Sequence, residues 1–298
     1  MKKNTQKLKG SVFVLISAFF FGSYGMWSKL MAGNFGDFSQ AWVRGLLLLI
    51  ILIPFGIFTK KFMRVKKQDI FWFVLISLSG GINQAPYFYG FRHLSVGTAT
   101  LLFYLMLTLG AFIIGKLFFG EVLTKVKYGS FALSAVGLFI IYRFTLSTDQ
   151  ILPALACMAA GLLGATFVAF SKKLSGNYSE IQILVYDIVA VVVCNLVFGW
   201  IFGEGLPLFH ANVAWIALVG YSISFLLANA TVIVGFKQLE PSIGGLLGLL
   251  EVVFAAIFGI LFFHEVLSLQ VILGSLFIIT AAALPDACSL IERKRAPR

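Results

Sequence analysis

Long apolar segments with almost no charge recur along the whole chain, and their length constrains the fold more than any other feature. Ten such segments of 19 to 24 residues are separated by short polar or basic loops. They lie near residues 11–31, 38–59, 70–91, 95–118, 125–143, 151–171, 180–203, 212–235, 241–263 and 267–287. A helix needs about 20 apolar residues to cross a bilayer core of about 30 Å. The pattern therefore predicts an all-α integral membrane protein with ten transmembrane helices.

The composition agrees with this reading and limits what else the chain can contain. Of the 298 residues 60% are hydrophobic and 12% are charged, against roughly 45–50% and 25% in soluble domains. Ten helices of about 22 residues leave only about 80 residues for tails and loops. An independently folding soluble domain needs about 50 residues or more in one piece. A soluble catalytic or nucleotide-binding domain, and with it a single-chain ATP-driven pump, is therefore excluded.

The positive charges indicate how the chain sits in the membrane. If the amino terminus is cytoplasmic, 19 of the 23 Lys and Arg residues fall in cytoplasmic segments. Lys29, Arg92 and Arg143 are then outside, and Arg44 lies within a helix. Cytoplasmic loops of membrane proteins collect Lys and Arg, so we expect both termini in the cytoplasm and a multi-pass location in the cell membrane. The net charge of +11 has the same origin, and no nucleic-acid partner is expected.

The chain also repeats itself at a constant spacing. Three pairs of segments match at offsets of 143, 145 and 144 residues: SKLMAGNFGD (28–37) with SKKLSGNYSE (171–180), GFRHL (90–94) with GFKQL (235–239), and FFGEVLT (118–124) with FFHEVLS (262–268). Each copy holds five of the ten segments. An odd number of crossings per copy makes the second copy run through the membrane in the opposite sense. Such inverted repeats are typical of secondary transporters that bind substrate near the midplane.

The repeats define the expected organisation. Residues 1–10 form a cytoplasmic tail, 11–143 the first five-helix repeat, 151–287 the second, and 288–298 a basic cytoplasmic tail. The chain resembles the EamA-type members of the drug/metabolite transporter superfamily. The resemblance rests on the two copies, the small-residue helix that follows a Gly-x-x-x-Leu pattern in each, the pair Leu250-Glu251 and the FFGEVLT/FFHEVLS signatures. The resemblance extends over nearly the whole chain.

This resemblance implies a ten-helix carrier with a central cavity that exports amino acids or related metabolites. It also implies that the fifth and tenth helices are peripheral. The family commonly has Leu-Glu-Pro in its ninth helix, whereas Val252 follows Glu251 in this chain. No proline kink is therefore expected at that point.

Charged residues deep in the apolar segments are the first candidates for function, because burying one costs roughly 2.5–3.5 kcal/mol on insertion scales. Glu251 lies near the middle of the ninth segment. It is a candidate proton carrier or partner for a substrate amine, and the alternative is a static link between helices.

Arg44 and Asp187 occupy equivalent positions in the two copies, and each lies about seven residues inside its segment. Inverted topology puts Arg44 nearer the outer face and Asp187 nearer the inner face, about 10 Å apart along the membrane normal. A direct ion pair between them is not expected. We interpret both as gate residues, with snorkelling to the interface or a static hydrogen bond as the alternative.

Amide and aromatic side chains complete the candidate binding residues. Gln84 aligns with Asn229 at the offset of 145, and Asn83 precedes Gln84. Buried amides need hydrogen-bond partners, so they bind either substrate or a neighbouring helix. Tyr24, Trp27, Tyr87, Tyr104 and Tyr221 lie near the same faces and suit a cation or a flat substrate, although aromatic residues also form interfacial belts.

Other motifs predict structure rather than chemistry. Glycines near Gly80 and Gly244, with Pro86, suit close packing or a helix break beside a cavity. Glu121 and Glu265 follow a helix and precede Thr124 and Ser268, which predicts helix-cap chemistry. The three histidines lie in expected loops without a second ligand at metal spacing, so no metal and no cofactor are expected.

These features favour secondary transport of a small polar metabolite, an amino acid or a related compound. The resemblance to the family implies export, and the proton is the candidate coupling ion. A monomer or weak homodimer is expected. The alternative within transport is an organic cation such as a choline-like compound or a drug, because Glu251 and nearby tyrosines can form a cage. No H-E-x-x-H motif, nucleophile elbow or catalytic carboxylate pair occurs, so an enzyme is not expected, and a channel is disfavoured.

Overall fold

The computed structural model describes residues 2–31, 34–94, 96–142, 148–209, 211–264 and 268–295, and the regular elements in this part of the chain are helices. The first half contains α1 (Lys2–Gly22), α2 (Tyr24–Met31), α3 (Ser39–Phe58), α4 (Ile70–Ile82), α5 (Gln84–His93), α6 (Val96–Phe119) and α7 (Lys125–Tyr142). The second half contains α8 (Ile151–Leu174), α9 (Glu180–Ile201), α10 (Val213–Gln238), α11 (Pro241–Gly248), α12 (Leu250–Phe263) and α13 (Leu269–Arg295). Short 3₁₀ turns, η1 (Lys67–Asp69) and η2 (Thr148–Gln150), precede α4 and α8.

Seven helical segments in the described chain are long and apolar enough to cross a membrane. They are Gln6–Met31, Ser39–Phe58, Thr98–Phe119, Thr148–Leu174, Glu180–Ile201, Val213–Gln238 and Pro241–Phe263, and the apolar part of α13, Leu269–Pro285, is shorter. The regular structure of the described chain is therefore helical, and its long apolar helices are those of a membrane protein. The count of ten crossings stays a prediction. Helix also extends through most of the two expected tails, since α1 begins at Lys2 and α13 ends at Arg295.

Three expected segments are interrupted rather than continuous. The first is broken at Ser23, whose hydroxyl donates to the carbonyl of Phe20 (2.6 Å). The third is broken at Asn83, three residues before Pro86, which has no N–H to donate to the carbonyl four residues earlier. The ninth is broken at Leu249 after Gly248 and has no proline there. The ninth segment is therefore interrupted although it has no proline there, contrary to the expectation that no kink occurs at this point.

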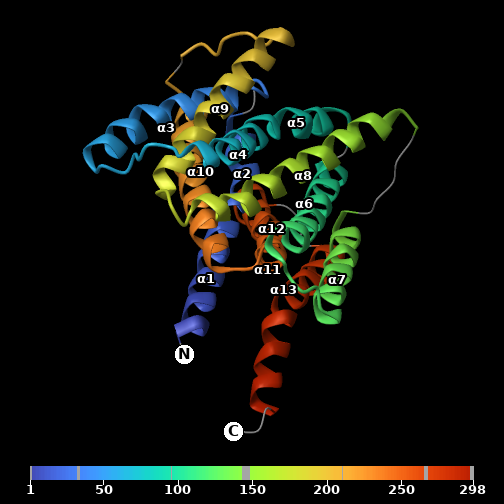
Figure 1. Ribbon diagram of the computed structural model, residues 1–298. Coiled ribbons are helices and arrows are strands. Elements are labelled where there is room, and N and C mark those ends of the chain that lie inside the picture. The colour runs from blue at the N-terminus through green and yellow to red at the C-terminus, as the bar shows by residue number, and fades with distance from the viewer. Residues whose placement is uncertain are drawn as a thin grey trace.

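The two halves pack reciprocally, as a repeat would. The first helix of the chain, α1, packs on α10, α11 and α12, whereas its counterpart α8 packs on α4, α5 and α6. Two equivalent pairs also meet, α3 with α9 and α7 with α13, and the latter pair lies at the edge of the molecule (Figure 1). At the α7–α13 contact a Cβ on Gly137 would lie 2.7 Å from the carbonyl oxygen of Gly274, so only small residues allow this approach.

The turns after α3 and α9 have the same geometry at an offset of 143. The N–H of Lys61 donates to the carbonyl of Gly56, and the N–H of Glu204 donates to that of Gly199, both at 2.8 Å. The preceding residues, Lys60 and Gly203, have φ angles of 51° and 69°. These are the bonds and the left-handed residue of a Schellman turn. The repeat read from the sequence therefore extends to backbone geometry.

Each of these turns holds the start of the equivalent helix in the other half. Glu204 accepts hydrogen bonds from the backbone N–H groups of Phe38 (2.9 Å) and Ser39 (2.7 Å), where α3 begins. The side chain of Gln182, near the start of α9, bonds both the N–H and the carbonyl of Met63 (3.0 and 2.8 Å). These contacts join the two halves at both ends of the α3–α9 pair.

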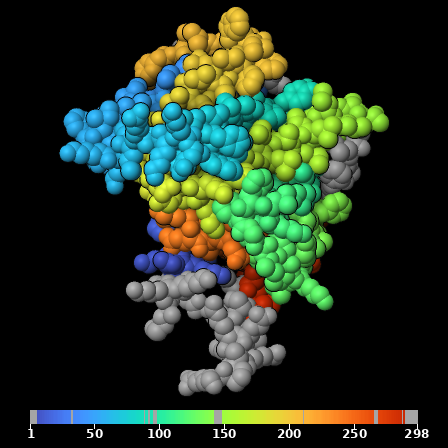
Figure 2. All heavy atoms as spheres, viewed as in Figure 1, coloured from blue at the N-terminus to red at the C-terminus, as the bar shows by residue number. Residues whose placement is uncertain are grey.

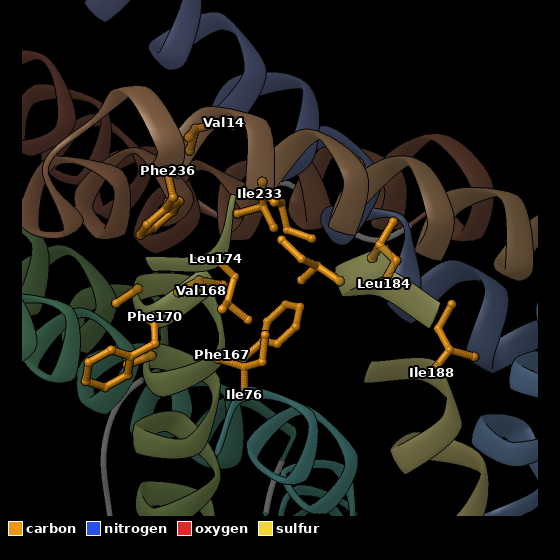
Figure 3. Close-up of a cluster of buried hydrophobic side chains, with 14 of the residues drawn as sticks. Val14, Ile76, Phe167, Val168, Phe170, Leu174, Leu184, Ile188, Ile233 and Phe236 are labelled. Carbon is orange, nitrogen blue, oxygen red and sulfur yellow. The ribbon is translucent and has the colours of Figure 1, made fainter. Parts of the chain in front are cut away.

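The core contains residues of both halves and the surface is strongly apolar. Val14 of α1, Ile76 of α4, Phe167 of α8 and Ile233 of α10 belong to one buried cluster (Figure 3). Large apolar side chains such as that of Ile50 also point outward. Figure 2 shows one packed face, on which the α3–α4 segment lies beside α8. In a lipid bilayer such outward-facing side chains contact hydrocarbon.

Candidate functional site

Arg44 is a buried cation whose guanidinium group forms no ion pair within the described chain. It lies on the second turn of α3 and is 1% exposed. Its Cζ atom lies over two rings of α10, 4.3 Å from the centroid of Tyr221 and 4.2 Å from that of Phe225. Its Nε and Nη2 atoms are buried and have no hydrogen-bond partner among the described residues. Arg44 therefore does not snorkel to the interface.

Asp187, the equivalent residue of the second half, lies in a notch at a glycine. It is on α9, is 2% exposed, and its Oδ1 atom would be 1.9 Å from a Cβ on Gly80 of α4. Within the described residues this oxygen has no hydrogen-bond partner. Arg44 and Asp187 interact electrostatically, but no ion pair joins them in the described structure.

Tyr24 connects Arg44 to other polar side chains. It begins α2, directly after the interruption at Ser23, and its ring centroid lies 4.7 Å from that of Tyr221. Its hydroxyl accepts a hydrogen bond from the side-chain amide of Asn229 (3.5 Å), and that amide also donates to the carbonyl of Phe225 (2.9 Å). Tyr24 interacts electrostatically with both Arg44 and Glu251.

Glu251 is placed by the interruption between α11 and α12. It is the second residue of α12 and is partly buried. The hydroxyl of Tyr104, on α6, donates a hydrogen bond to it. The ring of Phe103 lies 5.2 Å from that of Tyr104 and 4.3 Å from that of Tyr87 on α5. An aromatic row therefore extends from Glu251 towards α5.

Trp27 has a packing position beside this cluster. Its Nε1 atom donates to the hydroxyl oxygens of Ser224 (2.9 Å) and Ser23 (3.1 Å). Its ring lies against Gly220, where a Cβ would come within 2.6 Å of it. The tryptophan thus joins α2 to α10 at the break in the first segment.

The structure brings together Glu251, Asn229, Tyr104, Tyr221, Trp27, Arg44 and Asp187 of the predicted site residues, with Tyr24 as the link. We call this group, with Phe225, the central cluster. Phe225 was not predicted, although it lies one helical turn from Tyr221, which places it on the same face. The cluster draws on α2, α3 and α6 of the first half and on α9, α10 and α12 of the second.

Asn83, Gln84 and Tyr87 lie at the junction of α4 and α5, and Tyr87 is connected to the central cluster through the ring of Phe103. The amide nitrogen of Asn83 faces Gly164 of α8, 3.7 Å from where its Cβ would be. The buried Oε1 of Gln84 has no hydrogen-bond partner among the described residues. In the described part of the chain no interaction joins Gln84 to Asn229, its equivalent.

A second group of buried charges lies near the amino-terminal end of α1, and we call it the terminal cluster. Lys127 of α7 contacts Glu240 (2.6 Å) and Glu121 (3.4 Å), and the hydroxyl of Ser242 donates to Glu121. The expected cap chemistry is found at Thr124 and Ser268, whose hydroxyl oxygens accept from the N–H groups of Lys127 (3.4 Å) and Val271 (3.3 Å). Glu121 itself is buried, and its carboxylate pairs with Lys127, six residues further along the chain. Glu265, its equivalent, lies outside the described residues.

The terminal cluster borders a cavity of about 520 Å³ that is also lined by Phe119, Thr124 and Lys172. Lys172 donates to the carbonyl of Leu239. Burial alone would raise the pKa of Glu240, but the hydrogen bond and positive charge of Lys127 lower it below its usual value. Glu240 is therefore ionised at neutral pH and paired with Lys127. In the described residues no group of three or more His, Cys, Asp or Glu side chains could hold a metal ion.

Comparison with known proteins identifies the class of the chain. The model of the EamA-like transporter family matches residues 8–143 and 151–284. One solved crystal structure of a protein superposes with a TM-score of 0.78 at 15% identity, over 95% of this chain and 99% of that one. At this identity the likeness shows the fold alone. No curated protein matches the chain.

Proposed function

Because the chain belongs to the EamA-like transporter family, we propose that it is a secondary active carrier. Its substrate is a small polar metabolite, an amino acid or a related compound, which it exports across the cytoplasmic membrane by alternating access. Both termini face the cytoplasm, and the carrier works as a monomer or weak homodimer.

The central cluster is the observation that supports this proposal most directly. Polar side chains are expensive in a bilayer and usually mark a substrate or ion pathway. Here they come from both halves of the repeat, on helices interrupted at Ser23 and Leu249. Carriers built from inverted repeats bind substrate at such broken helices and rock one repeat against the other around it.

We assign the side chains by their chemistry. Glu251 pairs with a substrate amine or carries the coupling proton, and Tyr104 orients it. Asn229 and Tyr221 bind the polar part of the substrate with Tyr24, and Trp27 closes the cluster on one side. Asn83, Gln84 and Tyr87 line the route towards α5. Arg44 and Asp187 are the candidate gate residues, and a gate role would require them to change partners as the two halves move.

Counterflow in proteoliposomes tests the carrier directly. Vesicles are loaded with an unlabelled amino acid from the aromatic, aliphatic or hydroxy group, and entry of the labelled compound is followed. Saturable exchange of one group, weakened at least about tenfold by Glu251→Gln and by Asn229→Ala, is expected, because each change removes a hydrogen-bonding or charged group of the cluster. Glu180→Gln is the matched control, since Glu180 pairs with Lys237 on the surface (3.6 Å). Absence of exchange by folded protein would contradict the proposal.

A second candidate substrate is an organic cation. Glu251 lies beside Tyr104 and interacts with Tyr24, and a carboxylate with tyrosine rings binds quaternary ammonium groups well. Exchange of choline that is lost in Glu251→Gln and is untouched by amino acids would favour this candidate. Proton coupling predicts in addition that a pH gradient accelerates uptake in the wild type but not in Glu251→Gln.

A further inference from the structure

The side chain of Arg44 has an unused binding edge. Nε and Nη2, the two atoms without hydrogen-bond partners in the described structure, lie on the same edge of the guanidinium plane. This edge presents two parallel N–H groups, which match the two oxygens of a carboxylate. Arg44 is 1% exposed, so water in bulk does not satisfy these donors. A buried guanidinium without such a partner is costly.

The aromatic contacts hold the charge but do not satisfy its donors. Cation–π attraction acts through the face of the guanidinium plane. The rings of Tyr221 and Phe225 make this contact, and the in-plane N–H groups remain free. No glutamate or aspartate of the described chain completes an ion pair with Arg44. Asp187 interacts with Arg44 electrostatically without reaching these donors. The arrangement therefore holds the arginine in place and leaves the Nε and Nη2 donors without a hydrogen-bond partner among the described residues.

We propose that the Nε/Nη2 edge of Arg44 binds the carboxylate of the transported molecule. The substrate is therefore a carboxylate-bearing metabolite, such as a zwitterionic amino acid, and not a simple organic cation. This inference rests on the proposed carrier function and adds the group that the carrier recognises. Tyr221 and Phe225 position the guanidinium.

Carboxamides test the inference, because they keep the shape of the amino acid and remove the negative charge. Phenylalanine, leucine and threonine are compared with their carboxamides in counterflow. The wild type is expected to exchange an amino acid at least about tenfold better than its carboxamide, as is typical of hydrogen bonds to charged groups. Arg44→Gln loses this preference. Arg64→Gln, the same change at an exposed loop position, keeps it.

Stabilisation by ligand provides a readout that does not depend on transport. The same amino acids raise the unfolding temperature of the detergent-solubilised wild type, and they do not raise that of Arg44→Gln. If exchange occurs but carboxamides serve equally well, the inference is overturned while the carrier function stands. If no compound exchanges, the carrier proposal fails, and ligand stabilisation that depends on Arg44 still supports a carboxylate site.

The gate interpretation of Arg44 is distinguished in the same experiment. A gate pair predicts that Asp187→Asn and Arg44→Gln impair exchange alike, with no change in the preference for carboxylates over carboxamides. That result, or equal stabilisation of wild type and Arg44→Gln by amino acids, would overturn the inference.

Discussion

The central and terminal clusters both bury charged side chains, but they treat them in opposite ways. Lys127 in the terminal cluster contacts two carboxylates at 2.6 and 3.4 Å. Arg44 in the central cluster contacts aromatic rings, and its Nε/Nη2 edge bonds to no described residue. A buried charge that is paired with opposite charges holds helices together. A buried charge whose hydrogen-bond donors are unpaired can still bind a ligand. The comparison therefore separates a structural contact from a candidate binding site.

The largest effect is expected when the terminal cluster loses its cation. Lys127→Met leaves Glu121 buried without its positive partner, which costs roughly 3–5 kcal/mol of stability. Thermal or denaturant unfolding in detergent measures the loss. Lys125→Met, at an exposed position on the same helix, is the matched control and is expected to be nearly neutral. Equal losses in both variants would mean that Lys127 is not a structural contact.

A smaller effect is expected at the notch that holds Asp187. Gly80→Ala places a Cβ 1.9 Å from Oδ1 of Asp187, and such overpacking costs roughly 1–3 kcal/mol. Asp187→Ala in the same chain relieves the clash, so the two substitutions are non-additive. Gly25→Ala is the control, since no atom lies within 4 Å of its added Cβ. Additive losses would contradict a direct contact between the two positions.

Lowering the pH tests the terminal cluster by protonating the carboxylate of Glu240. The pKa of Glu240 in the folded chain is lowered below the ordinary glutamate value of 4.5. Its ion pair therefore stabilises the fold above pH 4.5, and this contribution is lost as the pH falls through the lowered pKa. The effect is less than about 1 kcal/mol, because the side chain is 40% exposed. Unfolding midpoints of wild type and Glu240→Gln are compared from pH 6 downwards, and they are expected to converge below pH 4.5. Parallel curves would contradict the prediction.

The smallest change in stability is expected at Arg44. Replacing an unpaired buried charge by an apolar side chain of similar length is often neutral or stabilising. Arg44→Met is therefore expected to alter the unfolding free energy by less than about 1 kcal/mol, because loss of the cation–π contact offsets relief of burial. A loss as large as that of Lys127→Met would show that Arg44 has a structural partner and would remove the contrast between the clusters.

Much of the fold could be predicted because its signals are local or periodic. Apolar segments of membrane length, the matched motifs and the resemblance to EamA-type proteins lead to the family that the comparison confirms. The glycines near Gly80 and Gly244 and Pro86 already suggested helix breaks, and α4/α5 and α11/α12 are interrupted close to them. The break at Ser23 lacked such a signal. Trp27 donates both to Ser23 and to Ser224 of α10, and the second contact is long-range.

The site was less accessible to sequence reasoning because its contacts are long-range. Counting residues into a helix gave the depth of Arg44, Asp187 and Glu251 but not what each faces. That Arg44 lies over Phe225 follows only from the packing of α3 on α10. The contact of Glu121 with Ser242 could not be predicted for the same reason, since the two residues lie 121 positions apart.

The notch at Gly80 constrains which residues this chain and its relatives can have at two pairs of positions. At the offset of 145, Phe225 of the second half is the equivalent of Gly80 of the first half. The second half therefore has an aromatic side chain where the first half has none. The ring lies over Arg44, and the empty space admits Asp187. Each half is therefore committed to its own residue pair, 44 with 225 and 187 with 80. In an alignment, we expect each pair to vary together: relatives without an acid at position 187 are free to replace the glycine, and relatives that keep the acid are not.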